Sequence, residues 1–178
     1  GASGGPVSIL NSDLIREISF YTGSFPANRG GALSSVMDIT LKDGNPDKQA
    51  FKAVIGASEV GASASGHIGN NTTYIASVRQ SYLQLLFRLL GLPMLPNYID
   101  GQFKSRTRID SRNEIAFIAL AGFDNMKLSD DPDDKGDEYL LSYLPVLKQE
   151  TFTIGTSYKH FSDRHIQTYS LSYSYLNN

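Results

Sequence analysis

The sequence predicts a mainly β fold, made of antiparallel up-and-down strands that form part of a barrel. Its 178 residues include 10 Tyr, 9 Phe and 16 Gly, a balance that favours β structure. After residue 49, apolar residues alternate with polar or small ones at a period of two over most of the chain. Short turns and long connections also follow one another along the chain, as they do in up-and-down strands.

The first elements are expected in the segment before this alternation. Asn11, Ser12 or Asp13 can cap a short helical turn. Two strands are then expected, over residues 16–22 and 36–41.

A break in the pattern follows these strands. Residues 42–49 read Lys-Asp-Gly-Asn-Pro-Asp-Lys-Gln, and their Gly, Asn and Pro interrupt any regular element. The sequence therefore predicts two domains, residues 1–44 and residues 45–178.

About seven strands are expected after the break. They cover residues 51–57, 60–68, 72–79, 103–109, 113–123, 151–160 and 168–175. The alternation is cleanest in the last two, where Phe152, Ile154, Tyr158 and His160 share one parity, as do Tyr169, Leu171, Tyr173 and Tyr175. Such alternation indicates strands with one apolar and one polar face.

The connections between these strands alternate in length. Tight turns are expected at 69–71, 110–112 and 162–164, and long segments at 81–102 and 125–149. Outer-membrane barrels show this asymmetry, with short periplasmic turns and longer extracellular loops. The first two strands break the rule, because residues 58–60 join them tightly.

One segment has helical character. Residues 82–92 are apolar on most sides, which predicts burial or insertion rather than an isolated exposed helix. The apolar stretch 82–95 contains Arg88, Gly91 and Pro93 and is shorter than the roughly 20 residues that a membrane-spanning helix requires.

The segment before residue 44 resembles the end of the plug domain of TonB-dependent outer-membrane receptors. The resemblance rests on residues 13–23, on Phe25-Pro26-Ala27, on Gly30-Gly31 and on residues 33–39. Residues 56–58, 65–69 and 77–82 resemble the first barrel strands of that family. The amino-acid sequence of residues 25–39 is similar to that of Bacteroidetes-type members. The residues that match the plug motif are Gly23, Pro26, Gly30, Gly31, Ser35, Asp38 and Ile39.

The resemblance implies the fold, the location and the function. Residues 1–44 would be the C-terminal part of a small α+β plug, and residues 45–178 the first strands of an incomplete β-barrel in the bacterial outer membrane. The parent protein would take up a siderophore, cobalamin, a glycan or a peptide with energy delivered by the TonB complex. Phe25, Asn28 and Arg29 are the candidates for a plug loop that faces this ligand.

Size limits what these residues can do by themselves. About seven strands cannot close a barrel of roughly 22 strands, so the segment alone would not transport. Its open edges and lipid-facing strands predict self-association or an open sheet. Tyr82, Tyr158, Tyr169, Tyr173 and Tyr175 are candidates for an interfacial aromatic girdle, with cross-strand aromatic pairs as the alternative.

Two charged groups have functional and structural interpretations. Lys104, Arg106 and Arg108 share one strand face and could bind an anionic ligand or line a watery lumen. An acidic segment, residues 130–138, could collect calcium, but its spacing is not that of an EF-hand and a mobile loop is the simpler interpretation.

Other function classes find little support. The net charge of -2 gives no reason to expect a nucleic-acid surface. The chain has no Cys, its three His residues form no ligand-spaced motif, and it has no nucleophile elbow, phosphate loop or zinc motif. We therefore predict that it is not an enzyme and that it holds no cofactor and no metal.

Two alternatives stay open. A passive porin or adhesin barrel would share the strand pattern but has no need of a plug ending. A soluble β-sandwich could bind carbohydrate or protein through its long loops and use the Tyr-rich faces as its core.

Overall fold

The computed structural model describes residues 10–22, 35–91, 94–128 and 147–177. It divides the chain into two compact units, one of which is Leu10–Lys42. The other contains all the strands after Asp43. Both units are built mainly from antiparallel β-strands, so the predicted mainly β class is confirmed.

The unit Leu10–Lys42 contains a short helical turn and two strands. The 3-10 turn Ser12–Leu14 begins at Asn11, whose side-chain oxygen accepts a hydrogen bond from the Asp13 backbone at 3.0 Å. The strands β1 (Ile15–Tyr21) and β2 (Val36–Leu41) pair antiparallel. The cap and both strands agree with the sequence prediction.

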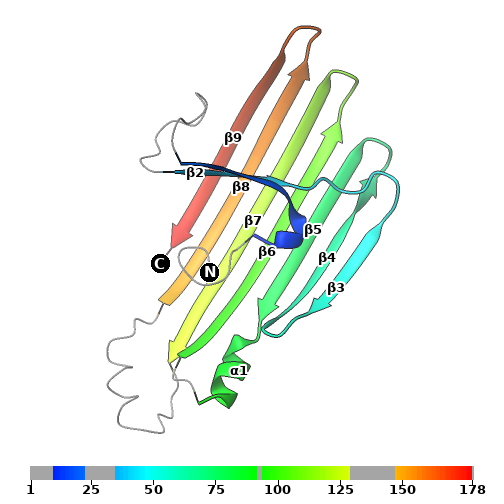
Figure 1. Ribbon diagram of the computed structural model, residues 1–178. Coiled ribbons are helices and arrows are strands. Elements are labelled where there is room, and N and C mark those ends of the chain that lie inside the picture. The colour runs from blue at the N-terminus through cyan, green and yellow to red at the C-terminus, as the bar shows by residue number, and fades with distance from the viewer. Residues whose placement is uncertain (1–9, 23–34, 92–93, 129–146, 178) are drawn as a thin grey trace. The chain divides into compact units, whose positions relative to one another are not determined.

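The other unit is a seven-stranded antiparallel sheet in which every strand pairs with its neighbours in sequence (Figure 1). Its strands are β3 (Ala50–Ile55), β4 (Glu59–Ile68), β5 (Thr72–Ser81), β6 (Met94–Arg108), β7 (Asn113–Leu128), β8 (Leu147–Phe161) and β9 (Ile166–Asn177). β3 and β9 lie at the two ends of the strand order. The expected number of strands is therefore confirmed.

The connections also follow the predicted order. The end of the sheet that we call the turn side carries the short connections 69–71, 109–112 and 162–165. The opposite end, the loop side, carries the long connections 82–93 and 129–146 together with the short 56–58. Gly69 has a φ of 61°, a left-handed conformation that glycine adopts without strain, at the first turn.

The two faces of the sheet differ sharply in chemistry. Residues paired across neighbouring strands project to the same side, so the strand register assigns each side chain to a face. One face, the apolar face, carries Phe51, Ile55, Val60, Ile68, Val78, Ile99, Phe103, Ile115, Phe117, Phe123, Phe152, Ile154, Tyr169, Leu171, Tyr173 and Tyr175. The opposite polar face carries mainly Ser, Thr and charged residues.

The predicted parities of the last strands are confirmed by this register. Phe152, Ile154 and Tyr158 pair with Tyr175, Tyr173 and Tyr169, all on the apolar face. The rings of Tyr158 and Tyr169 stack with centroids 6.3 Å apart. Ile118 and Leu120 are apolar exceptions on the polar face of β7.

The sequence prediction was wrong about the start of β6. The strand was expected at Phe103 and begins at Met94, so the long connection before it is shorter than predicted. Pro96 concealed the strand, because proline is rare inside sheets. It is tolerated here because β5 pairs with β6 only as far as Ile99, while Pro96 pairs with Met126 of β7.

The connection after β5 contains the predicted helix, but its expected burial within the chain is wrong. The helix α1 spans Leu83–Leu89 and has no buried residue. Leu85, Leu86, Leu89 and Leu90 are 59%, 37%, 76% and 64% exposed. They lie along one side of the helix because they are spaced by one, four and five residues.

Candidate functional site

Two groups of paired charges lie on the polar face of the sheet. Strict alternation along β4–β7 sends Glu59, Arg79, Asp100, Arg106 and Glu114 to this face. Arg79, Asp100 and Glu114 are buried, at 9%, 4% and 7% exposure. Because buried charges are costly unless paired, their partners determine what this face can do.

The first group, which we call the loop-side network, joins Glu59, Arg79, Tyr98 and Asp100. Arg79 donates two parallel hydrogen bonds to the Asp100 carboxylate, each 3.0 Å long. Another guanidinium nitrogen lies 3.8 Å from Glu59, and the Tyr98 hydroxyl donates to the same Glu59 oxygen at 2.7 Å. The bidentate pair has the geometry that arginine offers to a carboxylate.

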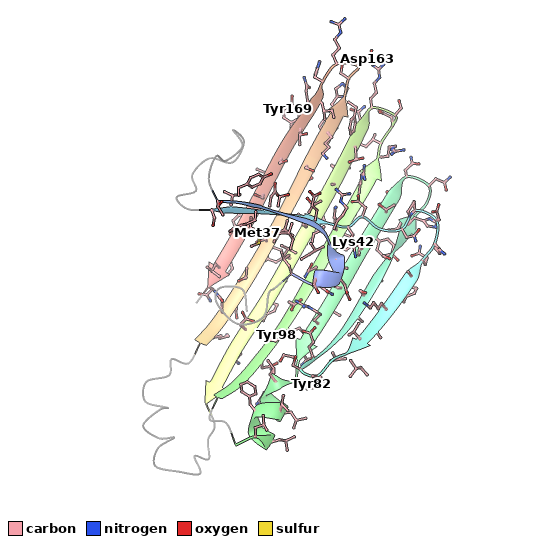
Figure 2. The ribbon with its side chains drawn as sticks, in the orientation of Figure 1. Met37, Lys42, Tyr82, Tyr98, Asp163 and Tyr169 are labelled. Atoms are coloured by element: carbon pink, nitrogen blue, oxygen red, sulfur yellow. The ribbon has the colours of Figure 1, made fainter. Side chains whose placement is uncertain are left out.

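Hydrogen bonds of Tyr82 attach the start of α1 to the 56–58 connection, which directly precedes Glu59 in the sequence. Figure 2 shows Tyr98 on the sheet and Tyr82 beside α1. The Tyr82 backbone donates to Ser58 at 2.9 Å, and its hydroxyl donates to the Gly56 carbonyl. Tyr82, one of the candidates for an aromatic girdle in the sequence analysis, thus bonds the 56–58 connection.

We call residues 43–49, which precede β3, the linker. The second group, the linker network, joins Asp43 of this segment to β6 and β7. Lys104 Nζ lies 2.7 Å from Asp43, and Arg106 lies 3.0 Å from the other Asp43 oxygen. Arg106 also pairs with Glu114 at 2.6 Å. The linker that precedes β3 is therefore attached to the polar face by charge.

A close backbone contact reinforces this attachment. Gly44 is buried, and a Cβ placed on it would lie 2.1 Å from the Tyr74 carbonyl oxygen. Only a residue without a side chain allows the linker to lie so close to β5. Asn45 then closes a turn by accepting from the Asp47 backbone at 2.9 Å.

The linker network sets the ionisation of Asp43. Desolvation by partial burial is the largest single effect and acts to raise the pKa of the carboxyl. The hydrogen bonds and positive charges of Lys104 and Arg106 together outweigh it, so the pKa of Asp43 lies below its ordinary value of 3.8. A group with a lowered folded-state pKa stabilises the fold when it is ionised.

We expect Asp43→Asn to lower the free energy of unfolding at neutral pH, by about 1 kcal/mol, because it removes the charge that pairs with two cations. This contribution is fully present above the ordinary pKa of 3.8 and is lost as the pH falls through the lower folded-state pKa. Urea unfolding of both proteins in detergent micelles, measured from pH 7 to pH 2, checks this. A stability difference that persists unchanged at the acid end would contradict it.

The three residues of the basic row predicted from the sequence differ in their surroundings. Lys104 and Arg106 lie on the polar face as expected, and both pair with carboxylates. Arg108 is exposed. The row is thus largely neutralised by Asp43 and Glu114, which agrees better with a wall of paired charges than with a free anion site.

Only part of the predicted plug motif lies in the described residues. Ser35 is exposed, just before β2, while Asp38 and Ile39 are half-buried within β2. Gly23, Pro26, Gly30 and Gly31 lie outside the described residues, as do the proposed ligand-facing Phe25, Asn28 and Arg29. Their roles stay predictions.

The described residues hold no cluster of three or more His, Cys, Asp or Glu side chains that could bind a metal ion. The acidic segment 130–138 lies outside them. His67 binds the Gly69 carbonyl at 2.9 Å, and His160 binds the Asn113 side chain at 2.8 Å. Both of these histidines are thus used locally, in or beside a turn.

The sequence analysis predicted the ion pairs of neither network. Asp43 was assigned to a domain boundary, and Asp100 to a long connection, so neither was matched with its cation. The alternation of Tyr98, Asp100, Gln102 and Lys104 in one phase was the signal that could have extended β6 and found the Arg79 partner.

None of the helices in the described part of the chain has both the length and the apolar character needed to cross a membrane. Comparisons of the chain with protein-family models, curated proteins and solved structures found no match.

Proposed function

We propose that this chain is part of a TonB-dependent outer-membrane receptor of the Bacteroidetes type. In this proposal residues 1–44 are the end of the plug and residues 45–178 are the first strands of the barrel. The whole protein takes up a nutrient, namely a siderophore, cobalamin, a glycan or a peptide, and the TonB complex supplies the energy.

The observation that carries the proposal is the exposed apolar face. Of the large exposed apolar side chains on β3–β9, all except Val54, Ile166 and Leu176 belong to it. Phe51, Ile55 and Leu171 are 79%, 84% and 75% exposed. A continuous apolar surface that crosses seven strands is far larger than water-soluble monomers normally expose, whereas lipid would cover it without cost.

The polar face supports a water-facing interior. In bacterial outer-membrane barrels, lipid-facing apolar residues alternate with lumen-facing polar residues along each strand. Here the second face carries Ser and Thr rows, the loop-side network and the linker network. Charges that are paired on that face suit a hydrated lumen better than the dry core of a sandwich.

The lengths of the connections give the sheet an orientation. Short connections on the turn side correspond to periplasmic turns, and the long 82–93 and 129–146 correspond to extracellular loops. The edge strands β3 and β9 leave backbone groups that further strands of a barrel would pair. The choice of a receptor over a porin rests on the resemblance of residues 13–39 to a plug ending.

An uptake experiment in cells tests the proposal. The full-length protein that carries these residues is expected to fractionate with the outer membrane. Accumulation of one radiolabelled probe from a set of ferric siderophore, cobalamin, oligosaccharide and peptide is expected to require both this protein and TonB. Uptake that continues without TonB would favour a passive porin, and recovery in the soluble fraction would favour a β-sandwich.

A further inference from the structure

Two consecutive residues, Lys42 and Asp43, are held by different units of the chain. Lys42 directly follows β2 (Figure 2), and its backbone donates to the Leu14 carbonyl at 2.7 Å. Its Nζ donates to the Asp13 carbonyl at 2.8 Å, so both bonds lie within the unit Leu10–Lys42. The Asp43 carboxylate instead pairs with two cations of β6. The change from one unit to the other therefore takes place across a single peptide bond.

The first two residues of the linker are fastened to the sheet. Asp43 bonds Lys104 and Arg106 of β6 at 2.7 and 3.0 Å, and Arg106 in turn bonds Glu114 of β7 at 2.6 Å. Hydrogen bonds of this kind, between charged groups, are roughly twice as strong as neutral ones. Gly44 lies so close to the backbone of β5 that a Cβ would overlap it. These contacts reach β5, β6 and β7 and bypass β3, the strand that follows the linker.

The last residue of the linker is fastened as well. Gln49 Nε2 donates to the His67 carbonyl of β4 at 2.7 Å, and Gln49 Oε1 accepts from the Tyr74 hydroxyl of β5 at 2.7 Å. The Gln49 amide lies against Gly66, where a Cβ would overlap it. Gly66 and Tyr74 are paired on the apolar face, so this attachment is made on the face opposite to that of the Asp43 ion pairs. The linker is thus held at both ends and on both faces of the sheet.

The strand β3, by contrast, has few contacts of its own. It has six residues, all of them exposed, and among the described strands it pairs with β4 alone. Tension that passed from Lys42 to Ala50, the first residue of β3, would act on this strand pair. Tension that reaches Asp43 first meets the ion pairs with β6 and the contact with β5. The order of residues along the chain therefore places the attachments of the linker ahead of β3.

We propose that the linker is a clamp, which stops a pull on the unit Leu10–Lys42 from reaching β3. The backbone torsions between Lys42 and Asp43 are then the pivot about which that unit moves, while the linker stays on the sheet. This assignment rests on the proposed function, in which energy from the TonB complex acts on the plug. It adds the point in the chain at which the displacement of the plug stops.

Insertions of known length locate the point that a pull reaches. The full-length protein in phosphatidylcholine vesicles is pulled from its N-terminus by atomic force microscopy, and the contour length released in each event is measured. One variant carries about 20 Gly and Ser residues between Ala27 and Asn28, in the connection from β1 to β2. A second carries the same insertion between Lys48 and Gln49, within the linker. Lys48 and Gln49 are both exposed, and exposed connections tolerate insertions.

We expect the insertion between β1 and β2 to lengthen the chain released with the plug by roughly 70 Å, at ~3.5 Å per residue. The linker insertion is expected to add nothing to that event and to appear only in a later one, when the clamp breaks. Equal lengthening by both insertions would overturn the clamp. Recovery of the full-length protein in the soluble fraction, or uptake without TonB, would instead overturn the proposed function, whichever point the pull reaches.

A substitution at Asp43 tests whether the ion pairs form the clamp. In Asp43→Asn with the linker insertion, we expect the additional ~70 Å to appear together with the release of the plug, because the cations of β6 lose their charged partner. Asp47→Asn is the matched control, since it makes the same change of charge at an exposed position of the same linker. Early release of the insertion in the control, or its absence in Asp43→Asn, would contradict the role of the ion pairs.

Discussion

Replacing Arg79 with Met is expected to lower the free energy of unfolding by about 3–5 kcal/mol, because it leaves the Asp100 carboxylate buried without the cation that pairs with it. Asp100 is 4% exposed and receives both of its 3.0 Å bonds from this guanidinium. Arg79 also lies 3.8 Å from Glu59, so its loss leaves two neighbouring negative charges uncompensated. Urea unfolding in detergent micelles, followed by circular dichroism, measures the effect.

An exposed ion pair gives the matched control. Arg112 lies 3.7 Å from Asp163, and their side chains are 63% and 90% exposed. Arg112→Met should therefore change the stability by less than about 1 kcal/mol. The double variant Arg79→Met with Asp100→Leu should regain most of the loss, since apolar residues often replace a buried pair without penalty. Equal effects of Arg79→Met and Arg112→Met would show that the loop-side network does not stabilise the sheet.

Replacing Gly44 with Ala is expected to destabilise the sheet unit by about 1–3 kcal/mol, the usual cost of overpacking, and to detach the linker from the polar face. The new Cβ would lie 2.1, 2.5 and 2.6 Å from the carbonyl oxygen, nitrogen and carbonyl carbon of Tyr74. These are backbone atoms of a paired strand and cannot turn aside as a flexible side chain would. Displacing the linker would also separate Asp43 from Lys104 and Arg106.

Gly101→Ala is the control for this change. A Cβ at Gly101 would meet the Ser77 carbonyl oxygen at 3.9 Å, an ordinary contact, so the stability should change by less than about 0.5 kcal/mol. Hydrogen exchange of residues 43–49 in the Gly44 variant reports whether the linker has come away from β5. Retention of native exchange rates in Gly44→Ala would contradict the predicted detachment.

Local patterns were enough to predict most of the strands of the sheet. A period of two identifies a strand and the sides of its residues without knowledge of its neighbours, which is why the parities of β8 and β9 were predicted correctly. The tight turns were predicted for the same reason, since Gly, Asn and Asp determine them within a few residues. The start of β6 was missed where Pro96 contradicted the local rule.

The candidate site was only half predictable. The alternation of a single strand is enough to place Lys104 and Arg106 on one face. It is not enough to identify their partners, because Asp43 lies 63 residues before Arg106 and meets it only when the linker folds onto the sheet. Without those partners, an anion site and a wall of paired charges look the same in the sequence.

The sequence by itself determined the β class, the two faces of the last strands and the order of short and long connections, because each depends on residues close together in the chain. The tertiary structure decided which charges are paired and that α1 is exposed. Those features depend on the register between strands, and a shift of one residue in register would send every side chain of a strand to the other face.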